Sequence, residues 1–195
     1  KIFKDRFGMS PKEWKNGGYK EYSNKILQQS QTASQSKADF KDIVPTIVKM
    51  PAIESFYIRN KGYNVNIKET WQKLQTWILT NNITSYKRIA LFHDNPTITP
   101  LNECQYIGCV MVDGNQKVKS DRLPNFKIAD GVYAKFDLKG KTGDVLPFIH
   151  WVYHEWLPKS EYETTTKPSY AIYKKLDFLD DSDEFDLSFY VSINF

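Results

Sequence analysis

Two histidines and four tyrosines are the side chains whose types and spacing could support chemistry in this chain. His150 and His154 are four residues apart, which is the spacing of two metal ligands on one face of a helix. A zinc site needs a third and usually a fourth ligand, and the sequence indicates none nearby. We therefore expect surface or cleft-rim histidines, with no metal, no cofactor and no catalytic residue.

The tyrosines are stronger candidates for binding a small molecule. Tyr106, Tyr133, Tyr173 and Tyr190 lie in segments predicted to be strands. A phenol can pack flat against a ligand while its hydroxyl makes a hydrogen bond. The chain contains 12 Tyr, 12 Phe and 5 Trp, or 15% aromatic residues. A core can absorb many rings, but this excess also suits a pocket for flat, apolar ligands.

Composition is that of an ordinary globular chain. Of the 195 residues, 41% are hydrophobic and 26% are charged, and no apolar run approaches the length that spans a bilayer. Cys104 and Cys109 are expected to face opposite sides of one strand, where they cannot form a disulfide. We therefore expect a cytoplasmic protein without a membrane partner.

The elements that must position the candidate residues fall into two similar groups. Apolar residues at helical spacing predict helices over 66–81 and 142–157, with Ile67, Trp71, Leu74 and Ile78 facing inward on the first. The order strand–helix–strand–strand occurs twice. It predicts an α+β fold of two pseudo-twofold duplicated βαββ halves with a cleft between them, plus one or two N-terminal helices. The predicted strands are 43–58, 88–92, 105–112, 126–138, 170–174 and 186–193.

Side-chain alternation selects the residues that could line this cleft. Along the last strand, Asp186, Ser188 and Tyr190 share one face, which is unusually polar for a buried sheet, and the opposite face is apolar core. Ala171 and Tyr173 share one side of the preceding strand. The predicted ligand-binding residues are Tyr106, Tyr133, Phe148, Trp151, Glu155, Ala171, Tyr173, Asp186, Ser188 and Tyr190.

The first 40 residues differ from the remainder. Ser10, Pro11 and Glu13 form a capping-box helix start, and Gly8 fits the turn before it. Residues 28–36 are almost entirely small and polar, which predicts a flexible linker. Residues 1–41 carry 9 Lys+Arg and 4 Asp+Glu, and the other residues carry 18 and 19. We therefore divide the chain into a helical segment (1–28), a linker (29–40) and a main domain (41–195).

The stretch from Phe3 to Lys15 resembles the end of the second helix-turn-helix of AraC-family transcription regulators. The resemblance implies that Lys4, Arg6, Lys12 and Lys15 are the remnant of a DNA-binding surface. It also implies that the full-length protein contacts DNA and RNA polymerase. A remnant this short is expected not to bind DNA specifically by itself.

The main domain resembles GyrI-like effector-binding domains. The resemblance rests on five short motifs in the family's order, and it implies a sensor that binds amphipathic, often cationic, small molecules in a cleft between two pseudo-symmetric halves. The motifs are Asp94-Asn95-Pro96 with Thr99-Pro100, Gly131-Val132-Tyr133-Ala134, Trp156-Leu157-Pro158 with Tyr162, Lys167-Pro168 with Tyr173, and Asp186-Leu187-Ser188-Phe189-Tyr190-Val191.

This chain departs from the family at two positions. The family commonly places a glutamate on its central strands, and the matching positions here are Ala171 and Ser188. Without these carboxylates we expect weak selectivity for cations, unless Asp186 or Glu155 supplies the charge.

Two other functions are compatible with the fold. Some relatives resemble hydrolases that open strained or electrophilic molecules with a cleft glutamate and tyrosines, and others are stand-alone gyrase inhibitors that bind a protein. This chain lacks the glutamates and shows no nucleophile–base set, so we expect no enzyme. The AraC-like segment favours a sensing domain over a stand-alone inhibitor.

Overall fold

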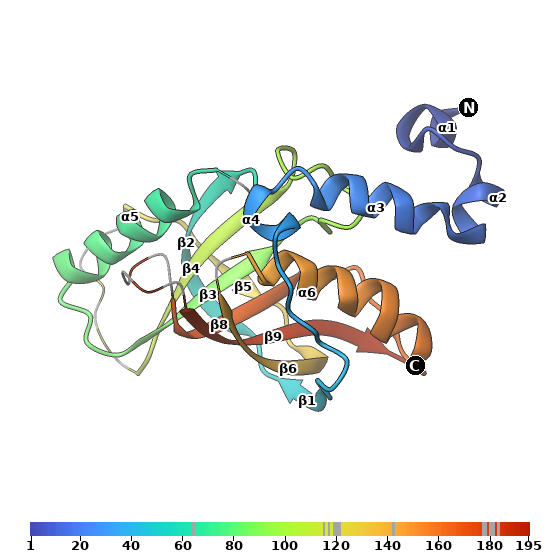
Figure 1. Cartoon of the computed structure of the whole chain (residues 1–195). Helices are drawn as coiled ribbons and strands as arrows, with labels where there is room; N and C mark the ends of the chain where they lie inside the picture. The colour runs from blue at the N-terminus through green and yellow to red at the C-terminus, as the bar shows by residue number, and fades with distance from the viewer. Residues whose placement is uncertain are drawn as a thin grey trace.

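One antiparallel sheet with two helices across one face forms the body of the molecule (Figure 1). The structure, a computed structural model, describes residues 1–63, 65–114, 116, 118, 122–141, 143–176, 179, 182 and 184–195. The strands are β1 (Thr46–Met50), β2 (Ile53–Lys61), β3 (Tyr86–Phe92), β4 (Gln105–Val112), β5 (Asn125–Ile128), β6 (Gly131–Lys141), β7 (Glu163–Thr164), β8 (Ser169–Lys175) and β9 (Glu184–Asn194). The helices across the sheet are α5 (Ile67–Thr80) and α6 (Val145–Trp151), and α6 continues through a π-helical turn (Val152–Trp156) and a 3₁₀ turn (Leu157–Lys159).

Strand order confirms the predicted duplication. The strands run β1-β6-β9-β8-β3-β4-β2-β5, with β7 paired to β9. The halves β2-α5-β3-β4 and β6-α6-β8-β9 therefore meet at β3 and β8 and extend outward in matching order. Each half is preceded by a strand that pairs with the other half, because β1 pairs with β6 and β5 pairs with β2. This exchange of first strands ties the two halves into one sheet.

Two apolar clusters occupy opposite faces of the sheet. The face under the helices holds Trp71 and Leu74 from α5, Phe148 and Ile149 from α6, and Phe189 from β9. The other face holds a separate cluster, which consists of Ile53, Ile89, Leu91, Ile107, Cys109, Ile128, Tyr133, Tyr170 and Tyr190. Both faces of the central strands are therefore buried. The alternation of polar and apolar residues along the strands did not predict this.

The N-terminal helices begin as the sequence predicts. Helix α1 (Ile2–Phe7) ends in a left-handed turn at Gly8, and α2 (Pro11–Glu13) begins with a capping box between Ser10 and Glu13. A kink over Trp14–Gly18 leads into α3 (Tyr19–Leu27). In Figure 1, α1 and α2 project away from the sheet while α3 lies beside α6. The side chains of Lys4, Arg6, Lys12 and Lys15 are exposed.

The segment after α3 differs from the flexible linker predicted for residues 29–40. Residues Gln31–Ser34 form a short helix, α4, and Ala33 is buried with 3% of its surface exposed. Gln29 Oε1 accepts a hydrogen bond from the Leu101 backbone, and Ser36 Oγ donates one to Asp144. A four-residue helix is not stable alone, so tertiary contacts that composition does not reveal hold this segment.

Candidate functional site

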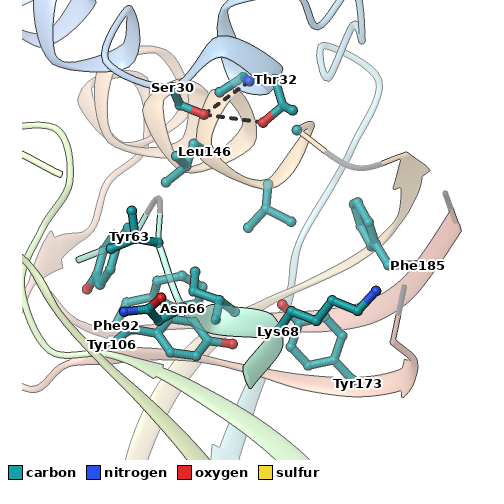
Figure 2. A pocket seen from close by; sticks show the side chains of 15 residues that line it. Ser30, Thr32, Tyr63, Asn66, Lys68, Phe92, Tyr106, Leu146, Tyr173 and Phe185 are labelled. Carbon is teal, nitrogen blue, oxygen red and sulfur yellow. Dashed lines mark hydrogen bonds between the residues drawn. The ribbon is translucent and has the colours of Figure 1, made fainter. Parts of the chain in front are cut away.

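A cavity of about 350 Å³ lies between the helices and the sheet on the pseudo-twofold axis (Figure 2). Its helical walls are the first turn of α5 (Asn66, Ile67, Lys68) and the first turn of α6 (Val145, Leu146). Its floor comes from the sheet, where Phe92, Tyr106, Tyr173 and Phe185 contribute rings from β3, β4, β8 and β9. Tyr63 and Val65, which precede α5, complete the wall. The volume and the apolar lining are those of a site for a small organic molecule.

Hydrogen bonds and ring contacts hold the floor in place. The Trp71 indole N–H donates to the Tyr106 hydroxyl at 2.9 Å, and the Trp71 ring meets Tyr173 edge-on at 5.9 Å. Tyr63 donates its hydroxyl to the Asp94 carbonyl at 2.7 Å, and burial raises the pKa of this phenol. Phe92 lies edge-on to both Tyr63 and Tyr106. The site is therefore preorganised, because its aromatic walls are fixed before any ligand enters.

The segment from Ser30 to Ala33 closes the remaining side of the cavity. Ser30 and Thr32 share a hydrogen bond of 3.3 Å, and Ser30 caps α4 by accepting from the Ala33 N–H. Gly143, just before α6, has φ +97° and lies under Thr32, so that a Cβ there would come within 2.6 Å of the Thr32 carbonyl oxygen. Figure 2 shows Ser30 and Thr32 above the aromatic floor. The cavity thus touches the segment that joins α3 to the domain.

Two of the ten predicted ligand-binding residues line this cavity, Tyr106 and Tyr173. Ala171 lies on the same face of β8 as Tyr173, as predicted, but it is fully buried in the core. Phe148 is likewise fully buried, with its ring against Phe40, Phe136, Trp151 and Phe189. Ala171 and Phe148 therefore belong to the apolar core under the helices.

The predicted residues on β9 lie on the face of the sheet opposite the cavity. Asp186, Ser188 and Tyr190 lie on the side of the sheet opposite the helices and the cavity, as does Tyr133 on β6. Tyr190 stacks on Tyr170 at 4.7 Å, and Tyr133 donates its hydroxyl to the Ala129 carbonyl. Alternation separated the two faces correctly, but both are buried, so polarity did not identify the face under the helices.

The carboxylate of Asp186 is therefore unable to serve the cavity. It pairs with Lys139 at 3.4 Å and with Lys174 at 3.6 Å. Ser188 donates to Asp137 at 2.5 Å, and this bond, together with Lys135, lowers the pKa of the Asp137 carboxyl. Position 188 faces away from the cavity, so of Ala171 and Ser188 only Ala171 lies on the face of the sheet that holds the cavity.

Trp151 and Glu155 line a second, more open hollow beside the end of α6. Its other walls include Lys41, Trp156 and Lys159. Glu155 bonds to Lys20 and to Lys159, both at 3.0 Å, and these bonds lower the pKa of its carboxyl. The carboxylate is already matched by two cations and does not face the aromatic cavity. It therefore does not supply the charge that Ala171 lacks.

The histidine pair lies between α6 and α3. His150 is buried with 6% of its surface exposed, and the Ser23 hydroxyl from α3 lies 2.9 Å from its Nδ1 and 2.7 Å from the Nε2 of His154. Burial, and then the neighbouring His154, lowers the pKa of His150 to about 4. Burial and Lys20 lower the pKa of His154. Among the described residues no group of His, Cys, Asp or Glu could hold a metal ion.

Several cavity residues escaped the sequence analysis, namely Tyr63, Phe92, Leu146, Phe185 and the α4 residues. The predicted duplication could have identified some of them. In a twofold arrangement the first turns of the two equivalent helices lie close together, so residues at both helix starts are candidates for a shared cavity. The contribution of α4 had no signal, since its composition predicts no packing. Cys104 and Cys109 are free, buried and in the opposite clusters, as predicted, although Cys104 precedes β4 and only Cys109 lies on it.

A duplicated antiparallel sheet with two helices and an aromatic-lined cavity on its axis defines the class as a small-molecule-binding domain. Residues 44–193 match the family described as GyrI-like small molecule binding domain, and the chain belongs to this family. No helix in the described part of the chain is long and apolar enough to cross a membrane.

Known proteins are similar to this chain in sequence or in fold. A DNA gyrase inhibitor from Citrobacter koseri is 23% identical over 109 residues, which cover 55% of this chain and 70% of that protein. The crystal structure of the EcmrR C-terminal domain is similar with a TM-score of 0.58 and 14% identity, covering 78% of this chain and 98% of that one. The cryo-EM structure of the EcmrR–DNA complex in EcmrR-RPo has a TM-score of 0.62 and 14% identity, covering 94% and 68%.

Proposed function

We propose that this chain is the effector-sensing part of an AraC-type transcription regulator, and that it binds amphipathic aromatic molecules in the cavity between α5, α6 and α4. The observation that carries the proposal is the composition of the cavity wall. Ser30, Thr32 and Ala33 contact the cavity and also belong to the segment that connects α3 to the domain. A ligand in contact with this wall can bind differently to two positions of the N-terminal helices, which is the requirement for a sensor.

A second contact links the cavity to the N-terminal helices. Helix α6 begins at the cavity with Val145 and Leu146, and further along it holds α3 through the Ser23–His150 and Ser23–His154 hydrogen bonds. Lys20 on α3 also pairs with Glu155. A displacement of α6 by a ligand would therefore reach α3 directly. The two routes, through α4 and through α6, start from the same cavity.

In the full-length regulator the N-terminal helices would continue into a DNA-binding unit, with DNA and RNA polymerase as partners in the cytoplasm. The AraC-like residues and the exposure of Lys4, Arg6, Lys12 and Lys15 support this. We propose no enzymatic activity, because the described cavity lining offers no carboxylate or imidazole as a general base. Tyr190, one of the tyrosines predicted to line the cleft, lies on the other face of the sheet.

Filling the cavity tests the assignment. We expect a neutral amphipathic aromatic, such as 2-naphthaleneacetamide, to raise the unfolding temperature and to bind in isothermal titration calorimetry. In Leu146→Trp the larger side chain occupies the cavity, and affinity should fall by about tenfold or more, which is 1.4 kcal/mol. Leu79→Trp adds the same ring on α5 at a residue with 66% exposure and serves as the control.

Equal binding by wild type, Leu146→Trp and Leu79→Trp would place the ligand elsewhere and contradict the assignment. Circular dichroism and the unfolding temperature without ligand show whether Leu146→Trp keeps the fold.

A further inference from the structure

The cavity lacks the negative charge that a cation-binding site needs among its described lining residues. Of the described residues that line it, Lys68 carries the single formal charge, and none is a carboxylate. Ala171, where the family resemblance implies a carboxylate, is fully buried on the same face of the sheet as Tyr173 and is not among the described residues that line the cavity. The carboxylates of Asp186 and Glu155 are directed elsewhere and paired with lysines. A cation in this cavity would therefore meet a like charge without a counter-charge.

Lys68 has no ion-pair partner among the described residues, whereas the next lysine on α5, Lys73, pairs with Glu69 at 2.7 Å. Lys68 is exposed, and in Figure 2 its side chain extends past Tyr173 at the edge of the cavity. It also stands in the first turn of α5, where the helix dipole disfavours a positive charge. An anion at the ammonium group would relieve this unfavourable placement.

The rest of the lining suits the apolar part of such a ligand. Tyr63, Phe92, Tyr106, Tyr173 and Phe185 line the cavity and are each no more than 8% exposed. Rings packed face to edge against these walls would bury most of an aromatic ligand. A molecule with an aromatic body and one acidic group thus fits the cavity in one orientation, with the body inside and the acid at the mouth.

We propose that the effector of this domain is an aromatic amphiphile that carries a carboxylate or another anionic group, held at the cavity mouth by Lys68. The inference rests on the proposed function, because it assigns the ligand class of the same cavity. It reverses the cation preference that the family resemblance implies.

Three ligands that share one ring system test the charge: 2-naphthaleneacetate, 2-naphthaleneacetamide and 2-(2-naphthyl)ethylammonium. By calorimetry at low salt we expect the anion to bind about tenfold more tightly than the amide, and the ammonium compound to bind more weakly than both. Lys68→Met keeps the apolar stem but removes the charge, so anion and amide should become nearly equal. Lys68→Glu should favour the ammonium compound, and Lys68→Arg should keep the preference for the anion.

The control is Lys73→Met, which removes a lysine of the same helix that does not line the cavity. It should leave all three affinities unchanged. Equal affinities for the three compounds, or a preference of the wild type for the ammonium compound, would overturn the inference while binding of the amide leaves the proposed function intact. If none of the three binds, both proposals fail. If Lys73→Met reduces anion affinity as much as Lys68→Met, general surface charge is responsible and Lys68 is not the anion site.

Discussion

The Ser23 hydroxyl connects two helices through two imidazoles. A hydroxyl has one O–H donor and two acceptor lone pairs, so the Ser23 hydroxyl can hydrogen-bond to both His150 and His154. Burial favours the neutral form of both rings, which lowers the pKa of His150 to about 4 and also lowers the pKa of His154. The contact between α3 and α6 therefore depends on the protonation state of these rings.

The stability of the folded chain should decrease as the pH is lowered, because of His150. In the unfolded chain this ring takes up a proton near its ordinary pKa of about 6.5, while the folded chain takes it up only near pH 4. Above about pH 6.5 the ring is neutral in both states and does not change the free energy of unfolding. Between about pH 6.5 and 4 the unfolded state binds more protons, so the free energy of unfolding decreases by up to about 3 kcal/mol. Urea unfolding of wild type and His150→Gln at about pH 7.5 and 5 measures this.

The matched control is His93→Gln, which alters the exposed histidine of this chain. We expect His93→Gln to show the same acid-induced loss as wild type and His150→Gln to show a smaller one. An undiminished loss in His150→Gln would assign the acid sensitivity to other groups.

At the scale of elements, α4 is the part that sequence reasoning could least predict. The helices α5 and α6, the N-terminal caps and the strands β3, β4, β8 and β9 follow from apolar periodicity and capping residues within a few residues. The predicted strands 43–58 and 126–138 are each divided into two, β1 with β2 and β5 with β6. By contrast Ser30, Thr32 and Ala33 belong to a small, polar run without periodicity. Their packing depends on Gly143 and Asp144, more than 100 positions later in the sequence, and no local pattern records such a contact.

The site was predicted only in part for a related reason. Tyr106 and Tyr173 were predicted as aromatic residues on strands, and their side chains lie on the face of the sheet that holds the cavity. Tyr133 and Tyr190 were predicted on the same grounds, but their side chains lie on the other face. The alternation of side chains along a strand does not distinguish these two pairs of tyrosines. The face is set by which side the helices cover, and this is decided by long-range topology, including the exchange of β1 and β5 between the halves.

Gly143 should be required for the position of α4. In Gly143→Ala the new methyl group would meet the Thr32 carbonyl, and alanine is also strained at φ +97°. We expect a loss of about 1–3 kcal/mol in unfolding free energy and faster proteolysis of the 28–36 segment.

Gly114→Ala is the control, because Gly114 also has a positive φ, +67°, but no atom lies within 4 Å of its added Cβ. It should carry the backbone cost alone and leave proteolysis of 28–36 unchanged. If both variants protect or expose that segment equally, contact with Gly143 does not position α4.

On the scale of the whole molecule, duplication creates the site. Each half alone offers a helix start and one side of a sheet, and the cavity exists because α5 and α6 bring their first turns to the same axis. The N-terminal segment then closes this space with α4 and is fastened to α6 through α3 (Figure 1). The arrangement couples the occupancy of an internal cavity to the placement of helices that project outside the domain.

Hydrogen exchange with and without ligand tests the coupling most directly. With the tightest binder of the three naphthalene compounds at saturation, amide exchange should change along residues 63–70, a stretch that contains the cavity residues Tyr63 and Lys68. It should also change in α4 and α3 (residues 19–36), because the ligand contacts the wall formed by Ser30, Thr32 and Ala33. A change confined to residues 63–70 and the sheet, with 19–36 exchanging as in the free protein, would contradict the account of this domain as a sensor.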